Sequence, residues 1–171
     1  LSIEIFDEGR EFYPAVRINA MAHGKIRALI EACPLEITWL STATVLPNGS
    51  VEITDVYVPA QMCSIGYTQV TEDGESELYQ ELIKQGARDV IRSLICWGHS
   101  HVRAPVFVSS TDLECTYDYI KQMRESRKSH FIRLIANKYD DLSASIYFLE
   151  EKRAVHHAPI VPERAETHLW R

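Results

Sequence analysis

The sequence lacks several features that would assign it to a broad class at once. No apolar run approaches the roughly 20 residues that a membrane-spanning helix needs, and the first residues show no signal-peptide pattern. Basic residues are not in excess, because 18 Lys and Arg stand against 24 Asp and Glu. We therefore expect neither membrane association nor general nucleic-acid binding, which needs a basic face to neutralise phosphates.

Recognisable cysteine motifs are also absent. The four cysteines include no CxxC pair, and their spacing resembles neither a disulfide framework nor a cysteine-only zinc site. The sequence leaves disulfides open, but we interpret these residues as reduced thiols and expect a cytoplasmic protein.

The composition is ordinary for one globular domain, with 46% hydrophobic and 25% charged residues among 171. Apolar periodicity predicts a strand at 15–18 and a helix at about 20–33. Two β-rich runs at 36–46 and 50–59, separated by the turn sequence PNG at 47–49, predict a β-hairpin.

The stretch SLICWGHSH at 93–101 is the most apolar and predicts a central strand, whereas 60–74 is polar and predicts irregular structure. The remaining predicted elements are helices at 75–84 and 112–125 and strands at 131–136 and 143–149. The side chains expected to pack the second of these helices are Leu113, Tyr117 and Ile120.

Together these elements predict an α/β fold, with a mixed β-sheet flanked by helices. We assign residues 1–150 to this domain. Residues 151–171 are charged and contain two prolines, so we expect them to form a C-terminal arm that packs on the domain or on a partner subunit.

The stretch WGHSHVRAPVFVSSTDLE, at 97–114, places metal-ligating residue types close together. His99 and His101 lie two residues apart on a predicted strand, so both imidazoles leave the same face. Asp112 lies in the first turn of the next predicted helix, where a loop can bring its carboxylate back to the strand. Two imidazoles and one carboxylate leave a fourth position for water, as in catalytic zinc sites.

Hydrolysis also needs a group that takes a proton and passes it to the leaving amine. Glu36, at the start of its predicted strand, is the candidate for this role. Ser109, three residues before Asp112, can donate its hydroxyl hydrogen to a developing oxyanion. Ser100 points to the opposite face of the strand and is expected to be structural.

Each of these residues also has a purely structural interpretation. Paired histidines can be hydrogen-bonded core residues, and a solitary glutamate is most often solvated. The sequence at 111–114 fits a helix capping box, in which Asp112 would be a favourable first-turn carboxylate. The joint spacing, rather than any single residue, favours the metal site.

This joint spacing resembles the JAMM motif of the MPN+ metalloproteases. Residues 99–112 give His-Ser-His, seven residues, a serine, two residues and an aspartate, without a mismatch. Glu36 in PLEITWL stands where the family has its upstream glutamate, and Trp97 matches a tryptophan commonly found before the two histidines. The resemblance covers roughly residues 12–150.

The resemblance implies a cytidine-deaminase-like α/β fold and a zinc-dependent isopeptidase, similar to deubiquitinases, that cuts after the C-terminal glycine of ubiquitin or a ubiquitin-like protein. The implied ligands of one zinc ion (Zn2+) per chain are His99, His101 and Asp112. Glu36 would be the general base and acid, and Ser109 the oxyanion partner. The segment 58–74 would clamp the extended substrate tail by added-strand pairing.

Some positions depart from the family pattern. Val102 replaces a proline that often follows the second histidine, and Trp39 stands where glycine is usual. Trp97 is flanked by Cys96 and Gly98, where the eukaryotic enzymes tend to have glycine and tyrosine. These differences favour a prokaryotic or phage-type member and leave the implied metal ligands unchanged.

Two other functions stay open: a peptidase acting on a sulfur-carrier protein of ubiquitin fold or on a phage protein, and a non-catalytic MPN scaffold. Scaffold members usually lack the motif ligands, which this sequence keeps. A nucleobase deaminase would need His-x-Glu and Pro-Cys-x-x-Cys, and neither is present.

Overall fold

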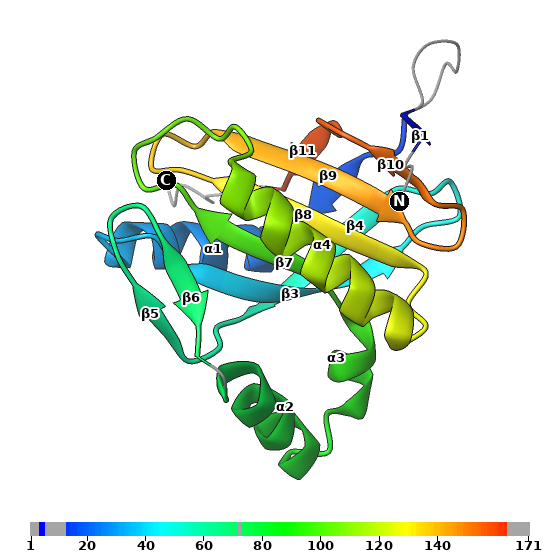
Figure 1. The fold of residues 1–171 in the computed structure, drawn as a ribbon, viewed down its shortest axis with the longest axis horizontal. Coiled ribbons are helices and arrows are strands. Elements are labelled where there is room, and N and C mark those ends of the chain that lie inside the picture. Colours follow the sequence, from blue (N-terminus) through cyan, green and yellow to red (C-terminus); the bar gives the residue numbers. More distant parts are fainter. Residues whose placement is uncertain (1–3, 6–12, 72, 164–171) are drawn as a thin grey trace, which may run out of the picture.

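A computed structural model describes residues 4–5, 13–71 and 73–163 of the chain. This part of the chain contains four helices and eleven strands (Figure 1). The helices are α1 (Ala20–Ala32), α2 (Gly74–Lys84), α3 (Arg88–Ser93) and α4 (Ser110–Glu125). The strands are β1 (Glu4–Ile5), β2 (Val16–Ile18), β3 (Thr38–Val45), β4 (Val51–Tyr57), β5 (Gln61–Cys63), β6 (Thr68–Val70), β7 (Leu94–Ser100), β8 (His130–Ala136), β9 (Leu142–Phe148), β10 (Arg153–Val155) and β11 (Ile160–Pro162).

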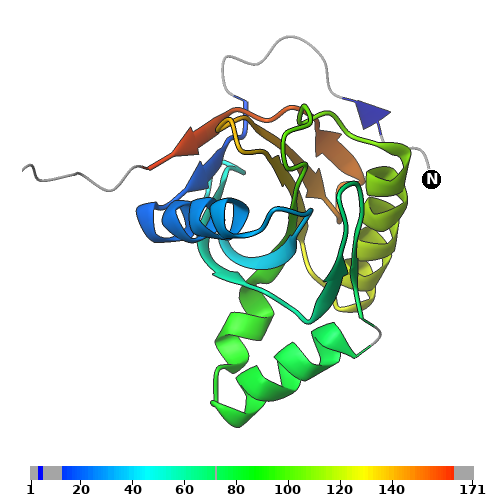
Figure 2. The same cartoon turned by 90° about the vertical axis from the view of Figure 1, so that its left-hand side faces the viewer.

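Nine of these strands form one mixed sheet, in the order β1-β10-β9-β8-β7-β3-β4-β2-β11. Figure 2 shows that the sheet curls strongly, with α1 and α4 on different sides of the molecule. Strand β7 lies in the middle of the order, between its antiparallel neighbour β3 and its parallel neighbour β8. The expected α/β fold, with a mixed sheet flanked by helices, is confirmed at this level.

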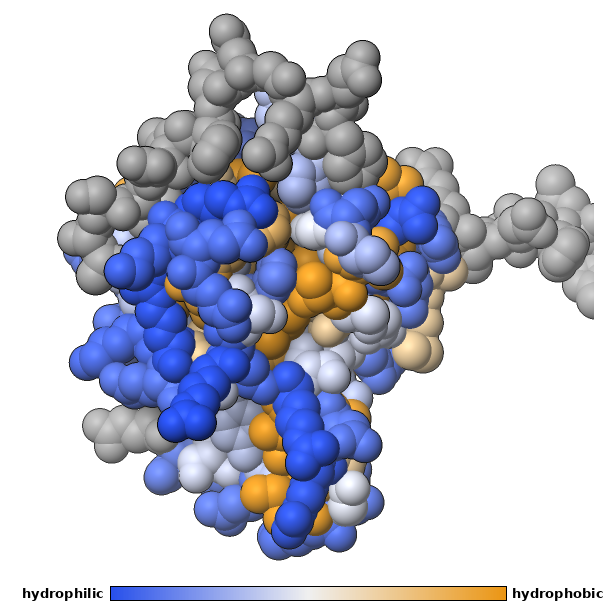
Figure 3. All heavy atoms as spheres, turned by 90° about the vertical axis from the view of Figure 1, so that its right-hand side faces the viewer, coloured by the Kyte–Doolittle hydropathy of each residue, from blue (hydrophilic) through white to orange (hydrophobic). Residues whose placement is uncertain are grey.

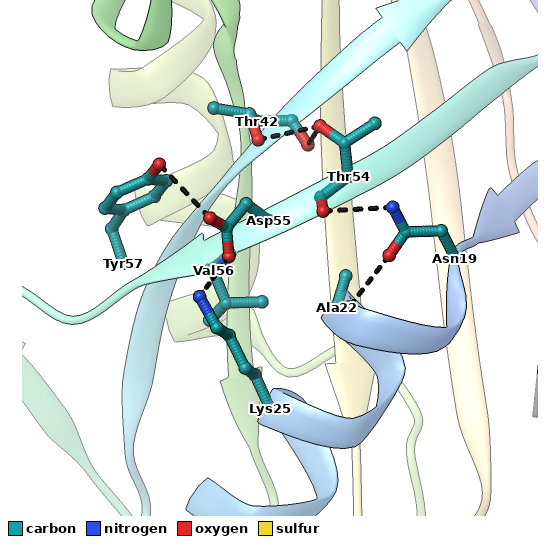
Figure 4. Close-up of polar contacts among 8 residues, drawn as sticks. All are labelled: Asn19, Ala22, Lys25, Thr42, Thr54, Asp55, Val56 and Tyr57. Carbon is teal, nitrogen blue, oxygen red and sulfur yellow. Dashed lines mark hydrogen bonds and ion pairs between the residues drawn. The ribbon is translucent and has the colours of Figure 1, made fainter. Parts of the chain in front are cut away.

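Polar side chains fix the start of α1 against β4 (Figure 4). Asn19 caps the helix, because its Oδ1 accepts a hydrogen bond from the Ala22 N–H at 2.8 Å. Its Nδ2 donates to the Thr54 carbonyl at 3.1 Å, and Lys25 pairs with Asp55 one residue further along β4. The residues that α1 buries on its inner face are Ala22, Ile26 and Ile30.

The predicted hairpin at 36–46 and 50–59 is confirmed, since β3 and β4 pair antiparallel. Gly49 in its turn has φ +81°, a left-handed conformation that glycine adopts without strain. The predicted central strand is β7, and all of its residues are buried.

The prediction of irregular structure at 60–74 was wrong, because β5 and β6 form an antiparallel hairpin there. Each strand has only three residues, which alternate between half-buried and exposed. The hydrophobicity of the sequence therefore did not indicate a strand here. The short helix α3 was also absent from the prediction. Both elements link the apolar strands β4 and β7.

The face of α4 that packs on the sheet also differs from the prediction. Leu113 and Tyr117 are 41% and 56% exposed, and Ile120 alone of the three expected residues is buried. The residues that α4 buries are Asp112, Thr116, Ile120 and Met123. Thr116 is polar, although an apolar residue was expected on the buried face. Its hydroxyl donates to the Asp112 carbonyl at 2.6 Å, so the buried hydroxyl has a hydrogen-bond partner. Asp112 lies on this buried face and contacts His99 of β7.

The described part of the C-terminal arm, 151–163, contributes two strands to the main sheet. Strand β10 pairs antiparallel with β9, and β11 pairs parallel with β2. The rest of the arm, 164–171, lies outside the described residues.

Helices α2 and α3 form a lobe that projects from the sheet, and its surface shows apolar residues among hydrophilic ones (Figure 3). Ile83 in α2, for example, is 50% exposed. Within the described ranges, neither these helices nor the other two are long and apolar enough to cross a membrane.

Gly98 on β7 makes room for the largest fully buried side chain of the described residues. Strands β3 and β7 pair Trp39 with Gly98. A Cβ atom at position 98 would lie 2.3 Å from Nε1 and 2.4 Å from Cε2 of the indole ring. Trp39 therefore lies directly over the glycine, on the face of the strand opposite the two histidines.

We expect Gly98→Ala to lower the free energy of unfolding by about 2 kcal/mol or more, because overpacking a closed core costs about 1–3 kcal/mol. Urea denaturation measures this change. Gly24→Ala is the matched control, since a Cβ there meets no atom within 4 Å, and it should stabilise α1 by about 0.5–1 kcal/mol. Similar unfolding curves for the two variants would contradict the proposed packing.

Candidate metal centre and active site

Strand β7 carries both histidines at its C-terminal end. His99 is the penultimate residue of β7, and His101 is the first residue after the strand, which ends at Ser100. Both imidazoles leave the same face, with their ring centroids 5.0 Å apart. Trp97 lies on that face as well and stacks on His99 at 4.6 Å between ring centroids. Ser100 points away, as expected, and its hydroxyl accepts a hydrogen bond from the Ile37 N–H at 3.1 Å.

The start of α4 brings Asp112 to the histidines. Ser109 is the N-cap residue: its Oγ accepts from the Asp112 N–H at 3.1 Å, and Asp112 Oδ2 accepts from the Ser109 N–H at 2.8 Å. The capping box therefore lies at 109–112, and the alternative at 111–114 was wrong. The cap holds the Asp112 carboxylate in place through Oδ2 and leaves Oδ1 directed toward β7.

The three side chains form a compact and largely buried group. Asp112 Oδ1 lies 2.9 Å from His99 Nε2, and Oδ2 lies 3.4 Å from His101 Nε2. Ligand atoms from the three residues lie within 4.8 Å of one another. Despite this approach, neither ring nitrogen of His99 has a hydrogen-bond partner among the described residues.

A buried imidazole without hydrogen bonds is unusual, because buried polar atoms nearly always find a partner. Nε2 of His99, which faces Asp112 Oδ1 at 2.9 Å without hydrogen-bond geometry, therefore fits a metal ligand better than a hydrogen-bonded core residue. The group formed by His99, His101 and Asp112 could hold a metal ion.

The loop after β7 orients the ring of His101. Its Nδ1 lies 2.8 Å from the Pro105 carbonyl oxygen, so Nδ1 carries the hydrogen and donates it, which leaves the lone pair of Nε2 for a metal. Asn137, a buried residue directly after β8, donates from Nδ2 to the Ala104 carbonyl at 3.1 Å. This amide holds the loop that in turn holds the imidazole.

We expect Asn137→Asp to weaken binding of a metal ion at this group, with zinc as the probe, by about tenfold, the lower end of the loss seen for outer-shell partners. The change removes the donor to Ala104 and sets a carboxylate against Asp141, whose Oδ2 now accepts from Asn137 at 2.9 Å. Competition with a chromophoric zinc chelator measures the affinity. Asn48→Asp is the control, because Asn48 Oδ1 accepts a hydrogen bond from the Ser50 N–H and an aspartate oxygen can accept the same bond. Equal metal affinities in the two variants would show that Asn137 does not support the metal site.

One cavity of about 250 Å³ unites the residues that the sequence singled out. The predicted site residues in its wall are Glu36, His99, His101, Ser109 and Asp112. Glu36 precedes β3 by two residues, and its N–H donates to the Ser64 carbonyl at 2.8 Å. The structure thus brings together side chains from β7, from the start of α4 and from the segment before β3.

Electrostatics at the site favour metal-binding forms of two ligands. Burial lowers the pKa of His99, so its imidazole stays neutral. Burial alone would raise the pKa of Asp112, but contacts with His101 and His99 hold that pKa well below its usual range. A neutral imidazole and an ionised carboxylate are the forms that bind metal.

The remaining two groups have raised pKa values. Burial raises the pKa of Glu36; His101 opposes this rise and Asp112 adds to it. Burial would lower the pKa of His101, but Asp112 and the Pro105 carbonyl outweigh burial and leave it raised. Without a metal, His101 therefore holds a proton more readily than usual, so metal binding releases that proton.

Sequence reasoning missed Phe107 and Asn137, and it included Tyr67 only within the segment 58–74. Phe107, in the loop after β7, and Tyr67, in the β5–β6 turn, line the cavity and are 62% and 45% exposed. An apolar ring inside the motif's own spacer was the available signal for Phe107. Asn137 could have been noticed as an amide directly after an apolar strand. The segment 58–74 borders the cavity through 66–68.

Comparison of the sequence with models of known protein families gives no match, and a search among curated proteins gives none either. The chemical interpretation of the site therefore rests on its geometry and on the spacing of its residues along the chain.

Proposed function

We propose that this protein is a zinc-dependent hydrolase of the JAMM type, which cleaves an isopeptide or peptide bond after the C-terminal glycine of ubiquitin or a ubiquitin-like protein. The observation that carries the proposal is the convergence of the five motif residues on one cavity. The curled mixed sheet flanked by helices is compatible with the cytidine-deaminase-like domain of that family.

The donor set fits zinc, which favours imidazole nitrogen and carboxylate oxygen and leaves a position open in catalytic sites. His99, His101 and Asp112 would hold the ion. When bound, zinc polarises a carbonyl oxygen and lets water act as a nucleophile near neutral pH.

The protein's own groups would manage the protons and the developing charge. Glu36 takes a proton from the attacking water and passes it to the leaving amine, and a raised pKa helps it to hold the proton between these steps. The Ser109 hydroxyl accepts from the Asp112 N–H. Its own hydrogen is directed to the substrate oxygen that becomes negative.

The β5–β6 hairpin would bind the substrate tail. Residues 66–68 line the cavity, and among the described residues β6 pairs with β5 alone. The outer edge of β6 therefore offers backbone groups to an extended tail by added-strand pairing.

The midpoint of the acid limb in the profile of kcat/KM against pH is expected above the ordinary glutamate pKa of about 4.3. Glu36 must be ionised to accept a proton, and burial raises its pKa, so activity is lost at a higher pH than for a solvated glutamate. Steady-state rates between about pH 4 and 8 measure the midpoint. The same acid limb in the residual activity of Glu36→Gln would contradict the role of Glu36.

The test of the function is cleavage of ubiquitin and of several ubiquitin-like and sulfur-carrier proteins, each joined through its C-terminus to a lysine side chain or a short peptide. Zinc-loaded protein should cut after the terminal glycine, a chelator should abolish the cut, and mass spectrometry locates it. Intact substrates with protein that holds one zinc ion would overturn the substrate class. Failure to bind zinc would overturn the hydrolase.

A further inference from the structure

The β5–β6 hairpin stands apart from the main sheet. Its strands form a two-stranded sheet of their own, and Figure 1 shows this hairpin beside the nine-stranded sheet rather than within it. Main-chain strand pairing therefore does not set its distance from Glu36. Another contact must fix this wall of the cavity.

The side chain of Gln61, the first residue of β5, takes the place of a strand partner for Thr38. Its Oε1 accepts from the Thr38 N–H at 2.7 Å, and its Nε2 donates to the Thr38 carbonyl at 2.8 Å. On the other side of β3, Thr38 pairs with His99. Strand β4 has ended with Tyr57 opposite Leu40, so the amide extends the pairing beyond that point.

The same amide uses its full hydrogen-bonding capacity, which is two donors and two acceptor lone pairs. Its Nε2 also donates to the Pro59 carbonyl at 3.1 Å, and its Oε1 also accepts from the Thr68 hydroxyl on β6 at 2.9 Å. A flipped amide would set donors against the Thr38 N–H, so this orientation is fixed by the network. One side chain thus connects β3, β5 and β6.

This connection lies close to the proposed general base. Thr38 follows Glu36 by two residues, and the Glu36 N–H donates to the Ser64 carbonyl in the β5–β6 turn at 2.8 Å. The hairpin and the Glu36 segment are therefore joined at two points, Gln61 to Thr38 and Ser64 to Glu36. Ser64 is exposed, so we expect loss of the first connection to let water compete for its carbonyl.

We propose that Gln61 is a positioning residue, which latches the β5–β6 hairpin to the start of β3 and thereby sets the substrate-binding edge of the cavity beside Glu36. Its effect on turnover rests on the proposed function, whereas its effect on the hairpin does not. Gln61 acts on the substrate edge and leaves the metal ligands on β7 and α4 in place.

Steady-state kinetics test the effect on the substrate edge. Gln61→Ala should raise KM by about tenfold while kcat and zinc content change by less than about twofold, because a binding interaction is lost without a loss of the reacting groups. Gln61→Glu keeps the length and the acceptor but loses both donors, so it should not restore KM. Gln122→Ala is the matched control, since Gln122 is an exposed glutamine of α4 that lies outside the hairpin and the cavity wall.

Amide hydrogen exchange tests the latch without any substrate. In Gln61→Ala the Glu36 amide should exchange at least about tenfold faster than in the wild type and in Gln122→Ala, with β8 amides unchanged. Faster exchange in a protein that cleaves nothing would support the latch and overturn the proposed function. Unchanged exchange at Glu36 would overturn the latch, and faster exchange with an unchanged KM would overturn its role at the substrate edge.

Discussion

Glu36→Gln is expected to bind zinc as the wild type does and to lose about 10²–10⁴-fold in kcat, the usual contribution of a general acid–base group. Glutamine is close in shape to glutamate, so the cavity is preserved, but its amide does not accept and release a proton near neutral pH. Glu36 also lies outside the three-residue ligand group. Metal analysis and turnover on a substrate that the wild type cleaves measure the two effects together.

Glu77→Gln controls for the loss of one negative charge, because Glu77 is an exposed residue of α2. This variant should match the wild type in both measurements. Wild-type turnover in Glu36→Gln would remove Glu36 from the mechanism. Loss of zinc in Glu36→Gln would instead place this residue among the ligands.

The proposed zinc site predicts that zinc raises the unfolding temperature of the wild-type protein and that Asp112→Asn loses most of this effect. Ligand at 100 times its Kd stabilises the folded state by about 2.7 kcal/mol, so the wild type should unfold at a higher temperature when zinc is added. An asparagine oxygen still accepts from the Ser109 N–H, which now donates to Asp112 at 2.8 Å, so the helix cap is kept. The negative charge that completes the ligand set is lost. Calorimetry with and without zinc measures the difference.

Asp118→Asn is the matched control on the same helix, because Asp118 is exposed. Its response to zinc should equal that of the wild type. An equal response in Asp112→Asn would exclude Asp112 as a ligand. Unfolding of metal-free Asp112→Asn at a much lower temperature than the metal-free wild type would show that the cap also depends on the charge.

The candidate metal centre could be predicted from the sequence because its geometry is set locally. His99 and His101 share a face through strand alternation, and Asp112 is fixed by a cap that lies three residues earlier in the chain. The supports of these ligands could not be predicted in the same way. A main-chain carbonyl such as that of Pro105 has no side-chain signature, and Asn137 reaches its loop only through the parallel pairing of β7 and β8.

The errors in the predicted fold have two physical causes. Periodicity rules equate buried with apolar, but α4 buries Asp112 and Thr116 because each has polar partners at its site. The β5–β6 hairpin has the opposite character. Its strands are short and partly exposed, and a side-chain amide at Gln61 supplies the connection that a longer strand would supply through its backbone.

The contact between Trp39 and Gly98 has a consequence for the evolution of this pair of strands. In the family that the sequence resembles, glycine is usual at the position of Trp39, and the eukaryotic enzymes tend to have tyrosine at the position of Gly98. Here the two positions are direct partners on β3 and β7, so there is room between them for one large ring. We expect these positions to co-vary among relatives. A ring at one would accompany glycine at the other, and the histidines on the opposite face would be spared by the exchange.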